Sequence, residues 1–221
     1  MLSRGYPGES QSKSAARVFV YRVASDAPRI GHAVALAGPT PESEVDLMKN
    51  YLRWPGERTH FVDWARDTLA RSRVLGALDN IKKIWPEANV RHADINQVVA
   101  ELPSIGFANL DFMGFSRTSV MPCVQSVIGR LVPNGVMALT WFRGREVDSP
   151  ERSAWDIFEA ARDIPDIENR RCAGVLRLVD GWGKAQGVNL KLRGAVEYLH
   201  FPKSRYKGAM SVAVWQRSSN V

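Results

Sequence analysis

Short apolar runs alternate along the chain with longer segments whose apolar positions recur every three or four residues. Residues 32–38 (HAVALAG) form a continuous apolar run that is followed by proline, which is typical of a strand buried on both faces. The next segment has Val45, Met48 and Leu52 at helical spacing. The same pattern predicts strands over residues 32–38, 59–64, 89–95, 106–115 and 135–142, and helices over residues 41–54, 67–85, 95–102 and 119–132 between them.

The C-terminal third begins with two helical stretches, over residues 153–164 and 170–186. Two further strands follow, over residues 194–202 and 208–217, and the short basic segment KSRYK joins them. A connection of this length predicts an antiparallel hairpin. Strands that alternate with helices imply right-handed crossovers, so we expect an α/β three-layer sandwich with a mainly parallel sheet and a terminal antiparallel hairpin.

Three aspartates end successive predicted strands: Asp63, Asp94 and Asp111. Ligands of such sheets bind at the carboxyl ends of the strands, near the point where the strand order reverses. Asp63 can accept hydrogen bonds from both hydroxyls of a ribose, Asp94 can accept one from an adenine amine, and Asp111 would face the reacting centre. The alternative for each is a helix N-cap, a position that favours aspartate.

The order of elements and these aspartates resemble the class I methyltransferases that use S-adenosylmethionine, over residues 31–217. The resemblance implies a Rossmann-like fold with seven strands, S-adenosylmethionine as cofactor and methyl transfer as activity. It matches LDFMG (110–114) to the family's fourth motif and LVPNG (131–135) to the turn before the fifth strand. The cofactor-binding residues that it implies are Ala37, Gly38, Pro39, Glu44, Asp63, Trp64, Asp94 and Ile95, with Asp111 as the catalytic candidate.

The loop after the first strand departs from the family pattern. The family usually has G-x-G-x-G there, whereas AGPTPES (37–43) has one glycine and two prolines. Proline lacks an N–H and stiffens the loop, so either the cofactor binds by another detail or it is no longer bound. Glu42 or Glu44 could hold the methionine ammonium, although acidity at a helix start is the simpler interpretation. Two functions follow: a methyltransferase for nucleic acid or a small molecule, or an inactive methyltransferase fold that serves in binding or regulation.

The formal net charge of +7 permits a nucleic-acid partner, because phosphate neutralisation by lysine and arginine drives such binding. Basic residues gather after the fifth strand and in KSRYK, where an aromatic side chain stands among them. The alternative is a solvated turn whose lysines protect a sheet edge. The candidate nucleic-acid contacts are Arg143, Arg145, Lys203, Arg205, Tyr206 and Lys207. Residues 1–16 are predicted to be a flexible basic arm and residues 17–221 a single domain.

Other classes of function are disfavoured by what the sequence lacks. Cys123 and Cys172 stand far apart, which is typical of free thiols in a reducing compartment and predicts a cytoplasmic protein. The four histidines have no second ligand at metal spacing, so no metal is assigned. His92 and His200 are candidate bases by residue type, but structural roles suit them better. No apolar run is long enough for a membrane helix, and no nicotinamide, P-loop or α/β-hydrolase fingerprint occurs.

Overall fold

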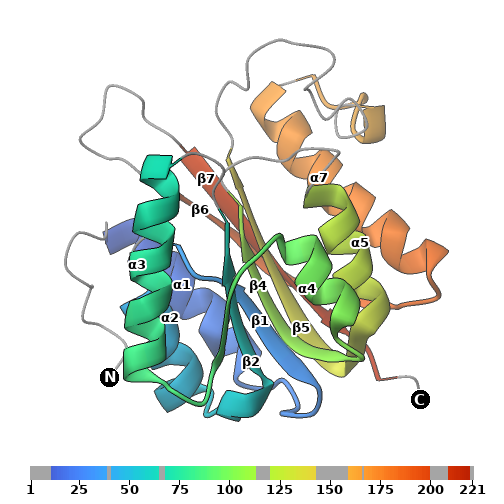
Figure 1. Cartoon of the computed structure of the whole chain (residues 1–221). Helices are drawn as coiled ribbons and strands as arrows, with labels where there is room; N and C mark the ends of the chain where they lie inside the picture. The colour runs from blue at the N-terminus through green and yellow to red at the C-terminus, as the bar shows by residue number, and fades with distance from the viewer. Residues whose placement is uncertain are drawn as a thin grey trace.

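The computed structural model describes residues 11–38, 41–64, 68–112, 120–142, 159–165, 167–199 and 209–219. Its centre is a seven-stranded sheet with the order β3-β2-β1-β4-β5-β7-β6 (Figure 1). The first five strands are parallel, and β7 lies antiparallel between β5 and β6. The strands are β1 (His32–Leu36), β2 (Thr59–Asp63), β3 (Asn89–His92), β4 (Ile105–Asp111), β5 (Leu131–Phe142), β6 (Leu190–Leu199) and β7 (Ala209–Arg217).

Helices cover both faces of this sheet, which makes the molecule a three-layer sandwich (Figure 1). One face packs against α1 (Gln11–Ala24), α2 (Glu42–Asp46) and α3 (Thr68–Ile84), and the other against α4 (Ile95–Glu101), α5 (Val120–Arg130) and α7 (Ile167–Ala185). A π-helix (Leu47–Tyr51) directly continues α2, and a short 3-10 turn (Gly56–Arg58) precedes β2. The predicted fold, including the antiparallel terminal pair of strands, is therefore confirmed.

The central strands are buried on both faces because a layer of helices covers each face of the sheet. Apolar side chains that point to either face therefore pack against helices. In β4, residues 105–110 are all buried, and the apolar side chains are divided between the two cores. Phe107 packs in the core beneath α1 and α2, whereas Ile105, Ala108 and Leu110 pack in the core beneath α4, α5 and α7. This double burial explains why the strand patterns read as continuous apolar runs.

The structure differs from the sequence prediction at the N-terminal end. A flexible arm was expected up to residue 16, but α1 begins at Gln11 and packs against β5, β6 and β7. Its apolar residues explain the helix: Ala16, Val20 and Ala24 recur every fourth residue and are buried against the sheet. Residues 11–16 therefore belong to the folded domain, and residues 1–10 lie outside the described part of the chain.

Several element boundaries also differ from the expected ones. The predicted helix over residues 41–54 is divided between α2 and the π-helix. β5 starts at Leu131 rather than at residue 135. Within its first residues, Asn134 has a left-handed conformation (φ +62°) and the register with β4 shifts. β6 begins at Leu190, four residues before the expected start, and a register shift between Leu192 and Gly194 interrupts its pairing with β7. Such bulges change which side chains face the core, so a strict alternation does not mark them.

Two histidines meet near the amino ends of β1 and β2. Nδ1 of His32 lies 2.9 Å from Nε2 of His60, and His60 is buried. Burial, together with the neighbouring His32 and Arg91, lowers the pKa of His60 from 6.5 to about 4. Burial likewise lowers the pKa of His32, with Arg58 adding to the effect. Both rings are therefore neutral in the folded protein at neutral pH.

We predict that the folded state loses stability as pH falls from 7 to 5, because the unfolded chain protonates His60 while the folded chain does not. With a folded pKa of about 4 against 6.5 unfolded, the free energy of unfolding should fall by about 2 kcal/mol at pH 5 from this group. Urea unfolding at both pH values measures the loss, and His60→Gln should show about 2 kcal/mol less of it. An equal loss in the variant would assign the pH dependence to other groups.

Candidate functional site

The carboxyl ends of β1, β2 and β4 meet at one edge of the sheet because these strands are parallel and adjacent. The chain order reverses at β1, whose neighbours are β2 on one side and β4 on the other. This is the position at which open α/β sheets bind ligands. Gly38 follows β1, Asp63 ends β2 and Asp111 ends β4, so the structure brings these three predicted residues to one edge.

The turn after β1 is built around Gly38, which has a left-handed backbone conformation (φ +64°). A side chain there would be strained by this φ, although a Cβ would meet no atom of the described residues within 4 Å. The strand pairing of β1 with β2 extends to this turn, since the backbone N–H of Ala37 donates to the carbonyl of Val62 at 3.0 Å. The backbone at Gly38 is therefore open to close approach by a ligand.

The Asp63 carboxylate lies between this turn and the residue that follows β2. It accepts a hydrogen bond from the backbone N–H of Trp64 at 2.7 Å, and another from the backbone N–H of Gly38. Burial raises the pKa of Asp63, while the two backbone donors and the nearby His92 act in the opposite direction. Trp64 beside it is 44% exposed. A fixed carboxylate next to an exposed indole can bind a ribose and the base attached to it.

Asp94 caps the helix that follows β3. Its Oδ1 accepts hydrogen bonds from the backbone N–H of Asn96 at 2.8 Å and from Nδ2 of the same residue at 2.9 Å. The capping alternative considered from the sequence is thus what the contacts of Asp94 show. Ile95, the first residue of α4, is buried in the core. Contact of Asp94 or Ile95 with an adenine stays a prediction.

A polar cluster formed by α1 was missed in the sequence. It consists of Lys13, Arg17 and Tyr21 on α1, Glu44 on α2, and Asn109 and Asp111 on β4, and we call it the α1 polar cluster. The Glu44 carboxylate accepts hydrogen bonds from the Tyr21 hydroxyl and from Nδ2 of Asn109, and its Oε2 lies 3.4 Å from Nε of Arg17. Lys13 Nζ lies 3.4 Å from Oδ2 of Asp111.

The two most buried charges of this cluster, on Arg17 and Glu44, lie next to each other and compensate one another. Tyr21 is fully buried, and its burial together with the Glu44 carboxylate raises the pKa of the hydroxyl well above 10. The hydroxyl therefore stays protonated and donates to Glu44. The signal in the sequence was the spacing of Lys13, Arg17 and Tyr21 at every fourth residue, beside an apolar stripe with the same spacing.

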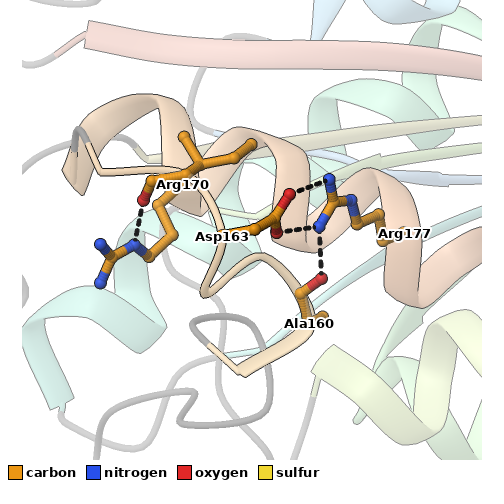
Figure 2. A network of polar contacts seen from close by, with 5 residues as sticks. Ala160, Asp163, Arg170 and Arg177 are labelled. Atoms are coloured by element: carbon orange, nitrogen blue, oxygen red, sulfur yellow. Dashed lines mark hydrogen bonds and ion pairs between the residues drawn. The ribbon is translucent and has the colours of Figure 1, made fainter.

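The segment before α7 is fastened to that helix by arginine side chains (Figure 2). Arg177 donates to both carboxylate oxygens of Asp163 and to the carbonyl of Ala160, and Nε of Arg170 donates to the carbonyl of Ile164 at 2.5 Å. The hydrogen bond from Arg177 lowers the pKa of Asp163. Figure 1 shows that α7 and α3 begin at the same end of the molecule, so this segment is held near the carboxyl edge of the sheet.

The remaining predicted residues lie outside the described part of the chain: Pro39, Arg143, Arg145, His200, Lys203, Arg205, Tyr206 and Lys207. Within the described residues, no three His, Cys, Asp or Glu side chains gather as a metal site would require. None of the described helices combines the length and apolar character that crossing a membrane demands.

The structure is similar to solved methyltransferases despite low sequence identity. One is a putative rRNA methylase from Clostridium thermocellum (TM-score 0.53, 10% identity, 93% of this chain and 97% of that one). Others are a putative RNA methyltransferase from Pyrococcus horikoshii (0.54, 11%, 99% and 89%) and the N-methyltransferase NodS from Bradyrhizobium japonicum (0.53, 10%, 94% and 97%). No protein-family model and no curated protein matches the sequence. The chain therefore has the Rossmann-like methyltransferase fold.

We predict that Asp94→Ala lowers the free energy of unfolding by about 1 kcal/mol, because α4 loses its N-cap. Asp94→Ser should cost only a few tenths of a kcal/mol, since a serine hydroxyl accepts the same bond from a backbone N–H. Urea unfolding of the two variants and the wild type provides the measurement. Equal destabilisation by both substitutions would show that the charge of Asp94, rather than its capping bond, is what the fold needs.

Proposed function

We propose that this chain is an S-adenosylmethionine-dependent methyltransferase whose acceptor is a nucleic acid or a small molecule. The observation that carries the proposal is the geometry at the ends of β1 and β2. There the Asp63 carboxylate is fixed by the N–H groups of Gly38 and Trp64, beside an exposed indole. The sheet that carries Asp63 belongs to a fold similar to that of solved methyltransferases.

The described residues suit this cofactor. Asp63 would accept the ribose hydroxyls, Trp64 would lie against the adenine, and the open space at Gly38 would admit the chain that joins the ribose to the methionine end. When bound, the cofactor supplies an electrophilic methyl group. The protein contributes mainly by proximity and alignment, with Asp111 at the end of β4 next to the place where the acceptor would lie.

Two classes of acceptor are consistent with the described residues. Two of the similar solved structures are described as RNA methylases, and the net charge of this chain is +7. These facts support RNA as the first acceptor to test, because phosphate contacts depend on positive charge. A small-molecule acceptor would need no such charge and would leave the basic residues as a solvated surface.

We predict that the purified protein binds S-adenosylmethionine and S-adenosylhomocysteine, and that Asp63→Ala weakens both by about 1–3 kcal/mol through loss of hydrogen bonds to a charged group. Calorimetric titration measures the affinities. Asp79→Ala, which removes an exposed carboxylate from α3, is the matched control and should bind like the wild type.

The same titration separates the active enzyme from its alternative. Unchanged affinity in Asp63→Ala would contradict the ribose assignment. A wild-type protein that binds neither ligand would favour an inactive methyltransferase fold with a binding or regulatory role, and would attribute that loss to the proline-bearing loop after β1.

We also predict that replacing Lys203, Arg205 and Lys207 together by alanine flattens the salt dependence of RNA binding. The variant would neutralise three phosphates fewer than the wild type. For single-stranded RNA, this should reduce the slope of log affinity against log salt concentration by about 2. Fluorescence anisotropy with a labelled RNA at several salt concentrations measures the slope, and Lys83→Ala on the exposed face of α3 is the control. A wild-type protein that binds neither RNA nor DNA at low salt would rule out the nucleic-acid acceptor.

A further inference from the structure

The polar stripe of α1 places two cations against two carboxylates at the carboxyl edge of the sheet. Lys13 pairs with Asp111, and Arg17 pairs with Glu44, each at 3.4 Å. The two pairs differ in access to solvent. The side chains of Arg17 and Glu44 are 12% and 6% exposed, whereas those of Lys13 and Asp111 are 19% and 30% exposed. The buried Arg17–Glu44 pair can hold α1 against α2. The Lys13–Asp111 pair is accessible enough to solvent to exchange partners with a ligand.

The strand register locates the open pair next to the turn after β1. Ala35 of β1 lies opposite Asn109 of β4. Two residues further along these parallel strands, Ala37 and Asp111 end at the same level, and Gly38 follows directly. The Lys13 ammonium at Asp111 therefore lies beside the loop that, in this fold, faces the end of the ligand opposite the base.

That loop is a poor donor of hydrogen bonds. Two of the four residues from 38 to 41 are prolines, which carry no backbone N–H. A carboxylate that approaches Gly38 consequently meets few backbone donors and needs a cation from elsewhere in the chain. Lys13 is a cation held at this edge by a described contact to a strand end, since it pairs with Asp111 of β4.

Asp111 also has capacity for a second partner. Its Oδ2 faces Lys13, while its Oδ1 is buried and accepts no hydrogen bond from the residues that the structure describes. A buried carboxylate oxygen without a partner costs free energy, which a bound ammonium would recover. The pair thus offers an ammonium group and a carboxylate oxygen that can accept a further hydrogen bond. Together they complement a ligand group that carries both a negative and a positive charge.

We propose, building on the function proposed above, that Lys13 and Asp111 bind the α-amino acid end of the cofactor in place of a glycine-rich loop. Lys13 holds the ligand carboxylate, and Asp111 accepts from the ligand ammonium. Arg17 and Glu44 are positioning residues that keep α1 against the sheet, with Tyr21 and Asn109 fixing the Glu44 carboxylate. The N-terminal helix is then part of the ligand site.

The test compares two ligands that differ only at this end. S-adenosylhomocysteine carries the amino acid group, and 5′-methylthioadenosine lacks it. Lys13→Gln should weaken the first by about 10- to 100-fold, the range for loss of a charge-assisted hydrogen bond, and should leave the second unchanged. Arg22→Gln, an exposed arginine on the same helix, is the control and should alter neither affinity.

Each outcome separates the inference from the function on which it builds. Retained binding of 5′-methylthioadenosine shows that the variant is folded and that the nucleoside site is intact. An equal loss for both ligands in Lys13→Gln, or no loss for either, overturns the role of Lys13 and leaves the methyltransferase proposal standing. If the wild type binds both ligands with equal affinity, the role of Lys13 is likewise overturned and the methyltransferase proposal is unaffected. A wild type that binds neither overturns both proposals.

Discussion

Burial of the central strands on both faces determines where polar chemistry can lie in this molecule. β1 and β4 lie between two helical layers, and their side chains fill both cores. A charged group in the middle of such a strand would have to be desolvated without compensation, so functional side chains are confined to the strand ends. Asp63 and Asp111 stand there, as does the glycine turn at residue 38. The position of the candidate site follows from the same burial that forms the core.

Asn109 shows how a polar residue is accommodated inside the sheet. Asn109 is buried within β4, and its amide donates to the Glu44 carboxylate. That carboxylate in turn receives Tyr21 and Arg17 from α1. The buried Glu44 carboxylate is therefore satisfied by partners from α1 and β4, as a low-dielectric interior requires. The network therefore ties α1, α2 and β4 together, and it gives the N-terminal helix a fixed orientation over the strand ends.

The proline-bearing loop and the α1 polar cluster have a common physical explanation. A glycine-rich loop binds a ligand through backbone donors, and proline removes them. In the role that we propose for Lys13, a side chain of α1 provides the missing charge, because the helix packs against β5, β6 and β7 and places Lys13 next to Asp111. Under that proposal, the lack of backbone donors in the loop is compensated by a segment far away in the sequence. A fold shared at about 10% identity leaves room for such exchanges.

The amino-acid sequence by itself determined the order of the strands along the chain, the mainly parallel sheet with its antiparallel terminal pair, and the aspartates at the strand ends. These follow from local periodicity and from the rule that ligands bind at carboxyl edges. Only the tertiary structure decided that Asp94 caps α4, that residues 11–16 belong to a packed helix, and that Lys13 meets Asp111. Contacts between side chains 98 positions apart, as between Lys13 and Asp111, depend on how helices pack on the sheet, which a local pattern does not encode.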